Sequence, residues 1–305
     1  MKNLSNDLRG EIELAASGKC LLWVDPAQSD PFDDALVQRC VRVPIQHWRF
    51  AQHRAPYLVE LDLAIAGDAA LFDESVELAL QAWTVDSLYA ERGQPICGWV
   101  STQASAQAVA NHWGWRCHVH GHDGKAKLLR FQDPGVREWL WPTLSVAQQR
   151  ALMGPAAQLF GLGRNKSVLR HACPSGEALP NYFKLDDRQW QEVGDYAAVH
   201  AAWLACARAP EALRSTAPFP TEAVLASLTH APGLGVTQES ERSKYAMHAV
   251  QLGARFYADA RMHPVWERTR ADSYYGSAIE DVFGCAASAL HLQWTVSEEQ
   301  TAWPT

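Results

Sequence analysis

The sequence predicts an α/β N-terminal lobe with a mixed sheet, followed by an all-helical C-terminal lobe. Up to residue 134, short apolar runs alternate with stretches of helical periodicity, which is typical of strands and helices built around one sheet. Beyond residue 185, every patterned segment has helical spacing, and a length of 305 residues suits two modest domains. We therefore expect an α/β domain at 1–155 and a helical lobe at 156–305, with the boundary anywhere in 155–185.

The expected strands of the first lobe are short apolar runs bounded by proline, glycine or aspartate. They lie at 19–25, 55–61, 96–101, 115–121 and 126–132. Pro56 stands at the entrance of its strand, where a missing N–H does little harm. The last two strands are joined by His122–Asp123–Gly124, whose Asp-Gly pair suits a tight hairpin.

The expected helices share apolar residues spaced three and four apart. In the first lobe they lie at 3–17, 31–40, 71–91, 104–113, 135–141 and 145–152. A looser stretch with several glycines and prolines runs to about residue 184. In the second lobe the expected helices lie at 186–208, 220–230, 238–258, 262–271 and 276–290.

The composition argues against several classes of protein. The formal net charge of −7 leaves no excess of Lys and Arg to neutralise phosphates, so we expect no nucleic-acid partner. No apolar run approaches the roughly 20 residues that cross a bilayer, and the N-terminus lacks the apolar centre of a signal peptide. We therefore expect a cytoplasmic protein without membrane association.

The cysteines and serines offer no recognisable chemistry. Seven cysteines are scattered without a CxxC pair, which favours neither a disulfide framework nor a zinc knuckle. Ser101 follows a strand, but its context lacks the GxSxG elbow of a nucleophilic serine. An N-cap made by Ser101 or Thr102 is the simpler interpretation. We expect no catalytic residue, no bound metal and no cofactor.

The strongest candidate for a metal site in the sequence is the group of His118, His120 and His122. On a strand these three side chains face the same way, and three imidazoles can hold zinc. They would be spread over roughly 13 Å, however, because each residue rises ~3.3 Å, and no HExxH motif or second His/Cys pair accompanies them. Solvated hairpin histidines are the preferred interpretation, and a metal-dependent enzyme is the alternative.

The segment Leu128–Pro134 combines an Arg with an Asp three residues later and ends on a proline. An arginine at the end of a strand can bond bidentately to a carboxylate or to carbonyls that the sheet leaves unpaired. We expect Arg130 and Asp133 to lock the end of this strand to the helix that follows.

The chain also carries thirteen tryptophans, an unusually large number. Tryptophan fills protein cores and is enriched among the anchors of protein–protein interfaces. The four that flank the expected strands are Trp113, Trp115, Trp139 and Trp141. We take these four as candidate partner-binding residues, with core packing as the alternative for each.

Four segments, in this order, resemble the signature of the type VI secretion effector adaptors, also called effector chaperones. They are Leu21–Asp25, Ala55–Glu60, Gly98–Ser101 and Arg130–Pro134, and the resemblance covers roughly residues 20–150. Gln132 departs from the family pattern, in which an aromatic residue is usual. The signature residues, which we expect to be structural, are Pro56, Tyr57, Leu58, Trp99, Ser101, Arg130, Phe131, Asp133 and Pro134.

The resemblance implies a non-enzymatic adaptor that binds one effector toxin, keeps it stable and loads it onto the VgrG spike, sometimes with a PAAR protein. It would also give the tryptophans a use, as a groove for a segment of the effector. Two rival hypotheses belong to other classes: the metal-dependent enzyme described above, and a structural component of the secretion apparatus.

Overall fold

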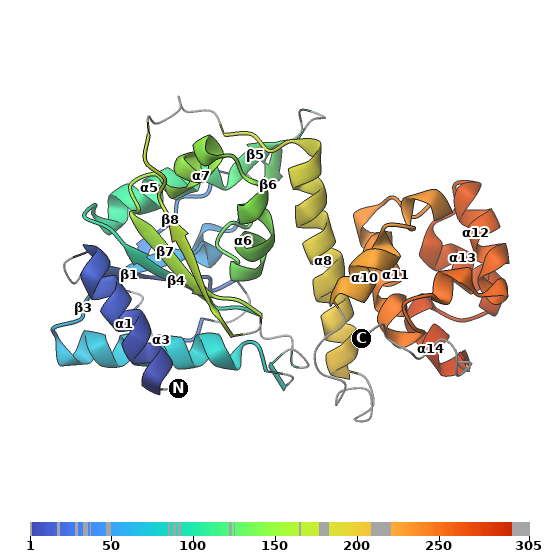
Figure 1. The fold of residues 1–305 in the computed structure, drawn as a ribbon, viewed down its shortest axis with the longest axis horizontal. Coiled ribbons are helices and arrows are strands. Elements are labelled where there is room, and N and C mark those ends of the chain that lie inside the picture. The colour runs from blue at the N-terminus through green and yellow to red at the C-terminus, as the bar shows by residue number, and fades with distance from the viewer. Residues whose placement is uncertain are drawn as a thin grey trace. The chain divides into compact units, whose positions relative to one another are not determined.

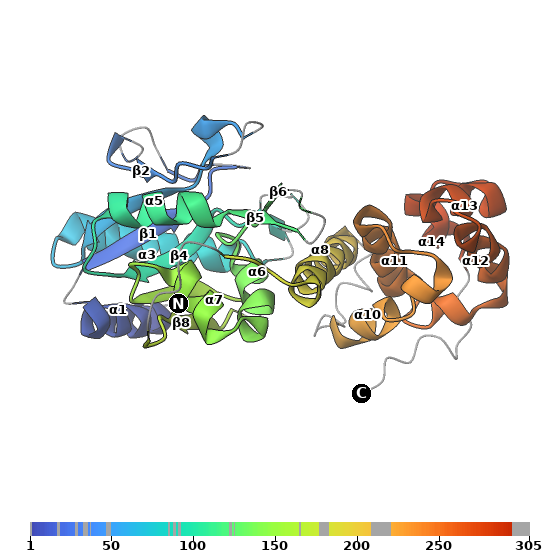
Figure 2. The same ribbon diagram turned by 90° about the horizontal axis from the view of Figure 1, so that it is seen from above.

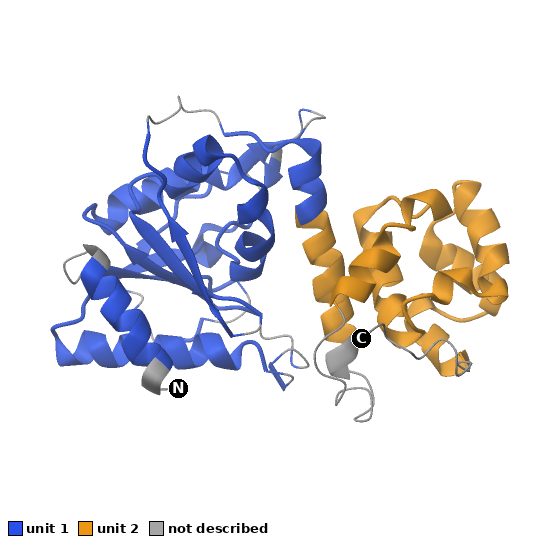
Figure 3. Ribbon diagram, viewed as in Figure 1, with its two compact units in different colours: residues 1–192 blue, residues 193–305 orange. Residues whose placement is uncertain are grey.

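The computed structural model describes most of the chain, with short gaps. The described residues are 2–16, 19–27, 30–32, 36, 38–46, 50–84, 86–87, 90, 93–121, 124, 126–164, 166–176, 183–208 and 221–294. The chain divides into two compact units, residues 1–192 and 193–305 (Figure 3). Each unit is described by itself below.

The first unit is organised by a six-stranded sheet with the order β2-β3-β1-β4-β7-β8 (Figure 1). The strands are β1 (Lys19–Val24), β2 (Val41–Arg42), β3 (Tyr57–Asp62), β4 (Ile96–Ser101), β7 (Gln158–Leu162) and β8 (Val168–Ala172). Every described pair of neighbouring strands is antiparallel, whereas the sequence predicted a mixed sheet. The strands β3 and β4 are both antiparallel to β1 and therefore run parallel to each other, as an α/β crossover requires. They are not paired with each other, because β1 lies between them.

Helices pack on both faces of this sheet (Figures 1 and 2). On one face, α1 (Lys2–Ala16) and α3 (Ala66–Gln81) share an apolar core with alternate residues of β1, β3 and β7. On the other face lies α5 (Ala106–Arg116), whose N-cap is Ser105, and not Ser101 or Thr102 as expected. Ser101 is instead buried within β4.

A separate two-stranded sheet, β5 (His118–His120) and β6 (Ala126–Leu128), forms the expected hairpin. The second strand is shorter than predicted, so Arg130 and Phe131 lie in the turn before α6 (Pro134–Leu140) and not in a strand. The helix α7 (Val146–Met153) follows.

The strands β7 and β8 lie in the stretch that the sequence predicted to be loose. They extend the sheet beyond β4, so the first unit runs past the expected 155–185 boundary window to residue 192. Both are short, and β7 contains Gly161, which weakens a strand pattern in the sequence.

The C-terminal part of the chain is all helical, as predicted. Helix α8 (Asp187–Arg208) begins in the first unit and continues into the second, which also contains α10 (Thr221–Leu228), α11 (Glu239–Gln251), α12 (His263–Arg270), α13 (Tyr275–Phe283) and α14 (Leu290–Gln293). The helix expected at 238–258 ends at Gln251, and Gly253 then takes a φ of +99°, in the left-handed region that ends helices. Within the described residues, no helix has the length and hydropathy of a membrane span.

Candidate functional site

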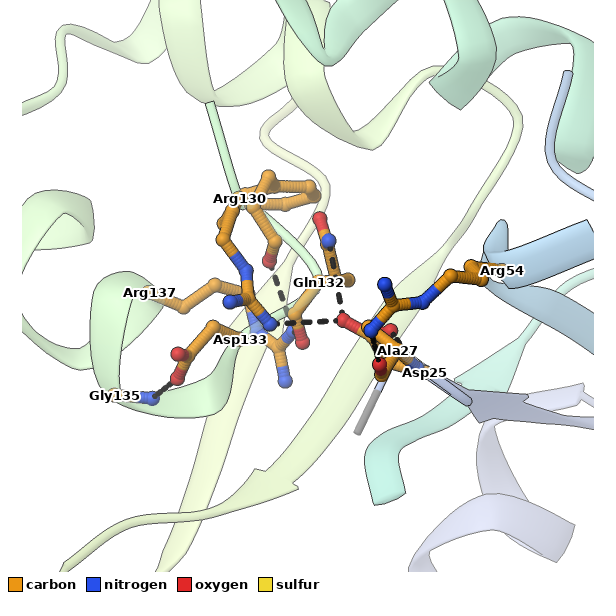
Figure 4. A network of polar contacts seen from close by, with 9 residues as sticks. Asp25, Ala27, Arg54, Arg130, Gln132, Asp133, Gly135 and Arg137 are labelled. Carbon is orange, nitrogen blue, oxygen red and sulfur yellow. Dashed lines mark hydrogen bonds and ion pairs between the residues drawn. The ribbon is translucent and has the colours of Figure 1, made fainter. Parts of the chain in front are cut away.

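Polar side chains gather where β1 ends. Asp25 directly follows β1 and is 4% exposed, and its Oδ2 accepts hydrogen bonds from Arg130 Nη2 at 3.0 Å and Gln132 Nε2 at 3.3 Å (Figure 4). Its Oδ1 accepts from the backbone N–H of Ala27 at 2.9 Å. One carboxylate therefore holds the turn before α6 against the end of the central strand.

A second guanidinium, that of Arg137 on α6, is fully buried and binds the backbone of this turn. Its Nη1 donates to the carbonyl oxygens of Phe131 at 3.0 Å and Gln132 at 2.8 Å, and its Nη2 donates to the carbonyl of Cys97. The guanidinium also lies over the ring of Trp23, 5.5 Å from the centroid. A buried cation is stabilised when carbonyls and aromatic faces replace its lost hydration in this way.

Two glycines make room for that cation. A Cβ on Gly161 of β7 would lie 2.8 Å from Arg137 Nη2, and one on Gly98 of β4 would lie 3.3 Å from the same atom. The Gly98 Cβ would also lie 2.0 Å from the carbonyl oxygen of Phe160. Burial lowers the pKa of Arg137 to about 10, so the group is still a cation at neutral pH. Sheet and helix are thus built closely around one charged side chain.

Asp133 begins α6. Its side chain accepts from the backbone N–H of Gly135 at 2.9 Å, and Pro134 occupies the first turn, where no backbone donor is needed. The sequence predicted that Arg130 and Asp133 lock a strand to this helix. In the structure three residues share this role, because Arg130 bonds Asp25, Asp133 caps the helix, and Arg137 binds the carbonyls.

Most of the signature residues lie in the interior. The Tyr57 hydroxyl donates to Asp30 Oδ1 at 2.7 Å, and Trp99 Nε1 donates to Ser75 Oγ at 2.8 Å, so both polar tips have partners. The buried members are Pro56, Tyr57, Leu58, Trp99, Ser101, Phe131 and Pro134. These residues build the sheet, the turn before α6 and the start of that helix, and they do not line an open site.

The structure corrects the placement of Trp113 as a partner-contacting residue. Its side chain is fully buried, stacks on Trp23 at 4.0 Å between ring centroids, and donates its Nε1–H to the carbonyl of Leu152 at 2.9 Å. Trp115, two residues later on α5, is 70% exposed. A partner can therefore reach Trp115 without disturbing the fold, whereas Trp113 belongs to the core.

Trp139 and Trp141 are half-buried. The guanidinium of Arg164 lies 5.0 Å from the ring centroid of Trp139, and the ring of Trp141 packs against His171 with centroids 4.4 Å apart. The four candidate tryptophans therefore do not form one exposed surface.

The hairpin brings together two of the three histidines. The rings of His118 and His120 lie 5.5 Å apart, and His122 lies outside the described residues. Within the part of the chain that the structure describes, no group of three or more His, Cys, Asp or Glu side chains could hold a metal ion.

Described residues line a surface cavity in each unit. The first, of about 460 Å³, lies between α1 and the strands β7 and β8 and is lined by Glu11, Leu14, Gln158, Arg170, His171 and Ala172. The second, of about 270 Å³, lies in the helical unit and is lined by Gly235, Thr237, Gln238, Glu241, Thr269, Asp272, Ser273, Tyr274 and Tyr275.

Comparison with known proteins gives one result. Residues 46–151 match the model of a family described as Domain of unknown function (DUF4123). Searches of curated proteins and of solved structures found no match. The matched range begins before β3 and ends within α7, so it includes β4, α5, the hairpin and the turn that carries Arg130. The chain therefore contains a DUF4123 domain.

Proposed function

We propose that this protein is an adaptor that binds a type VI secretion effector toxin in the cytoplasm of the producing cell. It would keep the toxin stable and load it onto the VgrG spike, with or without a PAAR protein. The observation that carries the proposal is the DUF4123 match at 46–151, together with the four segments that resemble the effector adaptors.

The geometry of these segments supports the proposal. Three of them fall on or beside β1, β3 and β4, which are neighbours in the sheet, and the fourth is the turn that Asp25 and Arg137 hold in place. Segments far apart in sequence thus form one continuous frame. A frame of this kind presents surface loops and helices to a partner, which is what an adaptor requires.

The polar network is better suited to positioning than to catalysis. Arg137 binds three backbone carbonyls in the interior, and Asp25 is 4% exposed. A general acid or base must lie within hydrogen-bond reach of a substrate, and these groups are occupied by the protein itself.

The test is a pull-down with the tagged full chain from the native bacterium with an active secretion system, with partners identified by mass spectrometry. We expect one toxin together with a spike protein. Recovery of neither would contradict the proposal. Large assemblies of the purified chain on gel filtration would favour a structural component, and stoichiometric bound zinc would favour the enzyme.

A further inference from the structure

The strand β8 lies at one edge of the six-stranded sheet and, among the described residues, has β7 as its single neighbour. The N–H of Cys173 donates to the carbonyl of Ala157, and the N–H of Gly163 donates to the carbonyl of Ser167. Because hydrogen-bonded positions alternate along an antiparallel pair, Leu169 and His171 direct their backbone groups toward β7. Val168, Arg170 and Ala172 therefore direct theirs away from the sheet.

At one end of this edge, a charged side chain protects the outward backbone groups. Arg170 Nη1 donates to the carbonyl oxygen of Val168 at 3.2 Å, and its Nε and Nη2 bind the two carboxylate oxygens of Glu11 at 2.7 and 2.6 Å. Proteins commonly protect edge strands with charged side chains of this kind. At Ala172, which is exposed, no hydrogen bond to the outward N–H or carbonyl occurs among the described residues.

A cavity lies directly beside the other end of the edge, at Ala172. It has a volume of about 460 Å³ and lies between the edge residues Arg170 and Ala172 and helix α1. Leu14 of α1 forms part of its wall and is 91% exposed, the most exposed large apolar side chain among the described residues. Backbone donors and acceptors in a row, with an apolar recess beside them, fit an extended peptide that pairs with the sheet.

We propose that the β8 edge binds an extended segment of a partner protein as an additional strand of the sheet. The segment places an apolar side chain against Leu14 and an acidic side chain beside Arg170. A guanidinium has five N–H donors, and Arg170 uses three of them in bonds to described residues, so two remain for the acid without displacing Glu11.

A second copy of this chain fits the edge less well. An antiparallel pairing centred on the middle of β8 makes the most backbone bonds, and it places Arg170 opposite Arg170 of the second copy. Like charges directly opposite each other destabilise such a pair. The partner is therefore a different protein, and for its biological identity this inference rests on the proposed adaptor function.

The experiment uses the full chain and a fluorescent, end-capped peptide of about seven residues, the length of a typical strand. Its valines alternate with threonine, and one valine is replaced by glutamate on the same face. Two further peptides carry N-methyl groups on the odd or on the even amides. Since only alternate amides face β8, one methylated peptide should bind at least about tenfold more weakly and the other should bind normally.

Two substitutions at one position complete the test. Ala172→Pro removes an N–H that points away from the sheet, which edge strands tolerate, and should weaken peptide binding at least about tenfold with an unchanged unfolding midpoint. Ala172→Thr retains the N–H and should bind like the unmodified chain. If both variants bind equally, if the unmodified chain does not bind below about 1 mM, or if Ala172→Pro dissolves a homodimer, the proposal is wrong.

The two proposals can fail separately. A toxin and spike captured equally by the unmodified chain and by Ala172→Pro would leave the adaptor function standing and overturn the edge as its docking site. Failure to capture a toxin would contradict the adaptor function, while the peptide experiment would still decide whether β8 binds extended chains.

Discussion

The first unit, residues 1–192 (the sheet unit), and the second, residues 193–305 (the helical unit), bury polar groups in different ways. In the sheet unit the buried cation Arg137 is held by three carbonyls, whereas His171, 5% exposed, has no hydrogen-bond partner for either ring nitrogen among the described residues. In the helical unit, His248 is fully buried with both nitrogens bonded, Nδ1 to the Tyr275 hydroxyl at 2.6 Å and Nε2 to the carbonyl of Ala287 at 2.7 Å.

The difference separates two uses of a buried polar side chain. Because a carbonyl only accepts, His248 carries its proton on Nε2, and Tyr275 donates to Nδ1. This imidazole joins α11, α13 and the segment that carries Ala287. The ring of His171 is placed by contact with Trp141, so it acts as a flat packing surface. Burial alone therefore does not tell which polar groups hold a unit together.

The largest effect is expected for Arg137→Met. Methionine fills similar space but leaves the carbonyls of Cys97, Phe131 and Gln132 without their donor, so the sheet unit should lose about 4–5 kcal/mol of unfolding free energy. Urea unfolding of the full chain measures this loss. Arg137→Lys keeps the charge but loses the forked set of N–H donors. Its unfolding free energy should lie between those of the unmodified chain and of Arg137→Met. A loss below about 1 kcal/mol for Arg137→Met would show that the cation does not hold the turn.

A slightly smaller effect is expected for Trp113→Ala in the same unit. The change removes a ring stacked on Trp23 and leaves a cavity, which should cost about 3–4 kcal/mol. Trp115→Ala on the same helix is the matched control, and its stability should stay within about 0.5 kcal/mol because the side chain is 70% exposed. Equal losses for the two variants would contradict this assignment of core and surface.

Parts of the fold could be predicted from sequence because they depend on local patterns. The strand expected at 96–101 coincides with β4, which is buried along its whole length. The helical wheel of α5 also separates its tryptophans: Trp113 follows Val109 by four residues and shares its buried face, and Trp115 lies on the opposite side. The strands β7 and β8 were missed because they are short and polar-interrupted, and pairing with β4 stabilises them.

The polar network could not be predicted in full. Arg130 was identified, but its partner Asp25 lies 105 residues away, and nothing local specifies that contact. Arg137 was overlooked because a charged residue in a short helix is ordinarily exposed. Its burial depends on close contacts with Gly98 and Gly161 of the sheet, which no local pattern indicates.

Acid should destabilise both units through their neutral histidines. Burial lowers the pKa of His248 from 6.5 to about 4, although the hydrogen bond to the Ala287 carbonyl opposes this shift. Burial, followed by the charge of Arg137, lowers the pKa of His171 to about 3. Below pH 6.5 the unfolded chain binds protons that the folded chain does not, so stability is complete above that pH and falls as the pH drops toward 4 and 3. His248 alone should account for about 3 kcal/mol of this loss.

Amide exchange between pH 7 and pH 4 measures this loss in each unit separately. Opening free energies in α11 and α13 should decrease in the helical unit, and those in β7 and β8 in the sheet unit. Exchange that is independent of pH after correction for its intrinsic rate would contradict the burial of neutral imidazoles.

The smallest changes in stability are expected for substitutions of the two buried histidines at pH 7. They test directly whether the two units bury histidine in different ways. His248→Leu leaves the Tyr275 hydroxyl and the Ala287 carbonyl without partners in the interior, and should cost the helical unit about 2 kcal/mol. His171→Leu removes no hydrogen bond to any described residue and should change the stability of the sheet unit by less than about 1 kcal/mol, in either direction. Equal losses at the two positions would mean that His171 has a polar partner, such as a bound water, and that the two units bury histidine in the same way. A larger loss for His248→Leu than for His171→Leu would establish that the helical unit depends on the hydrogen bonds of the His248 imidazole. The sheet unit would then depend on the His171 imidazole only for packing.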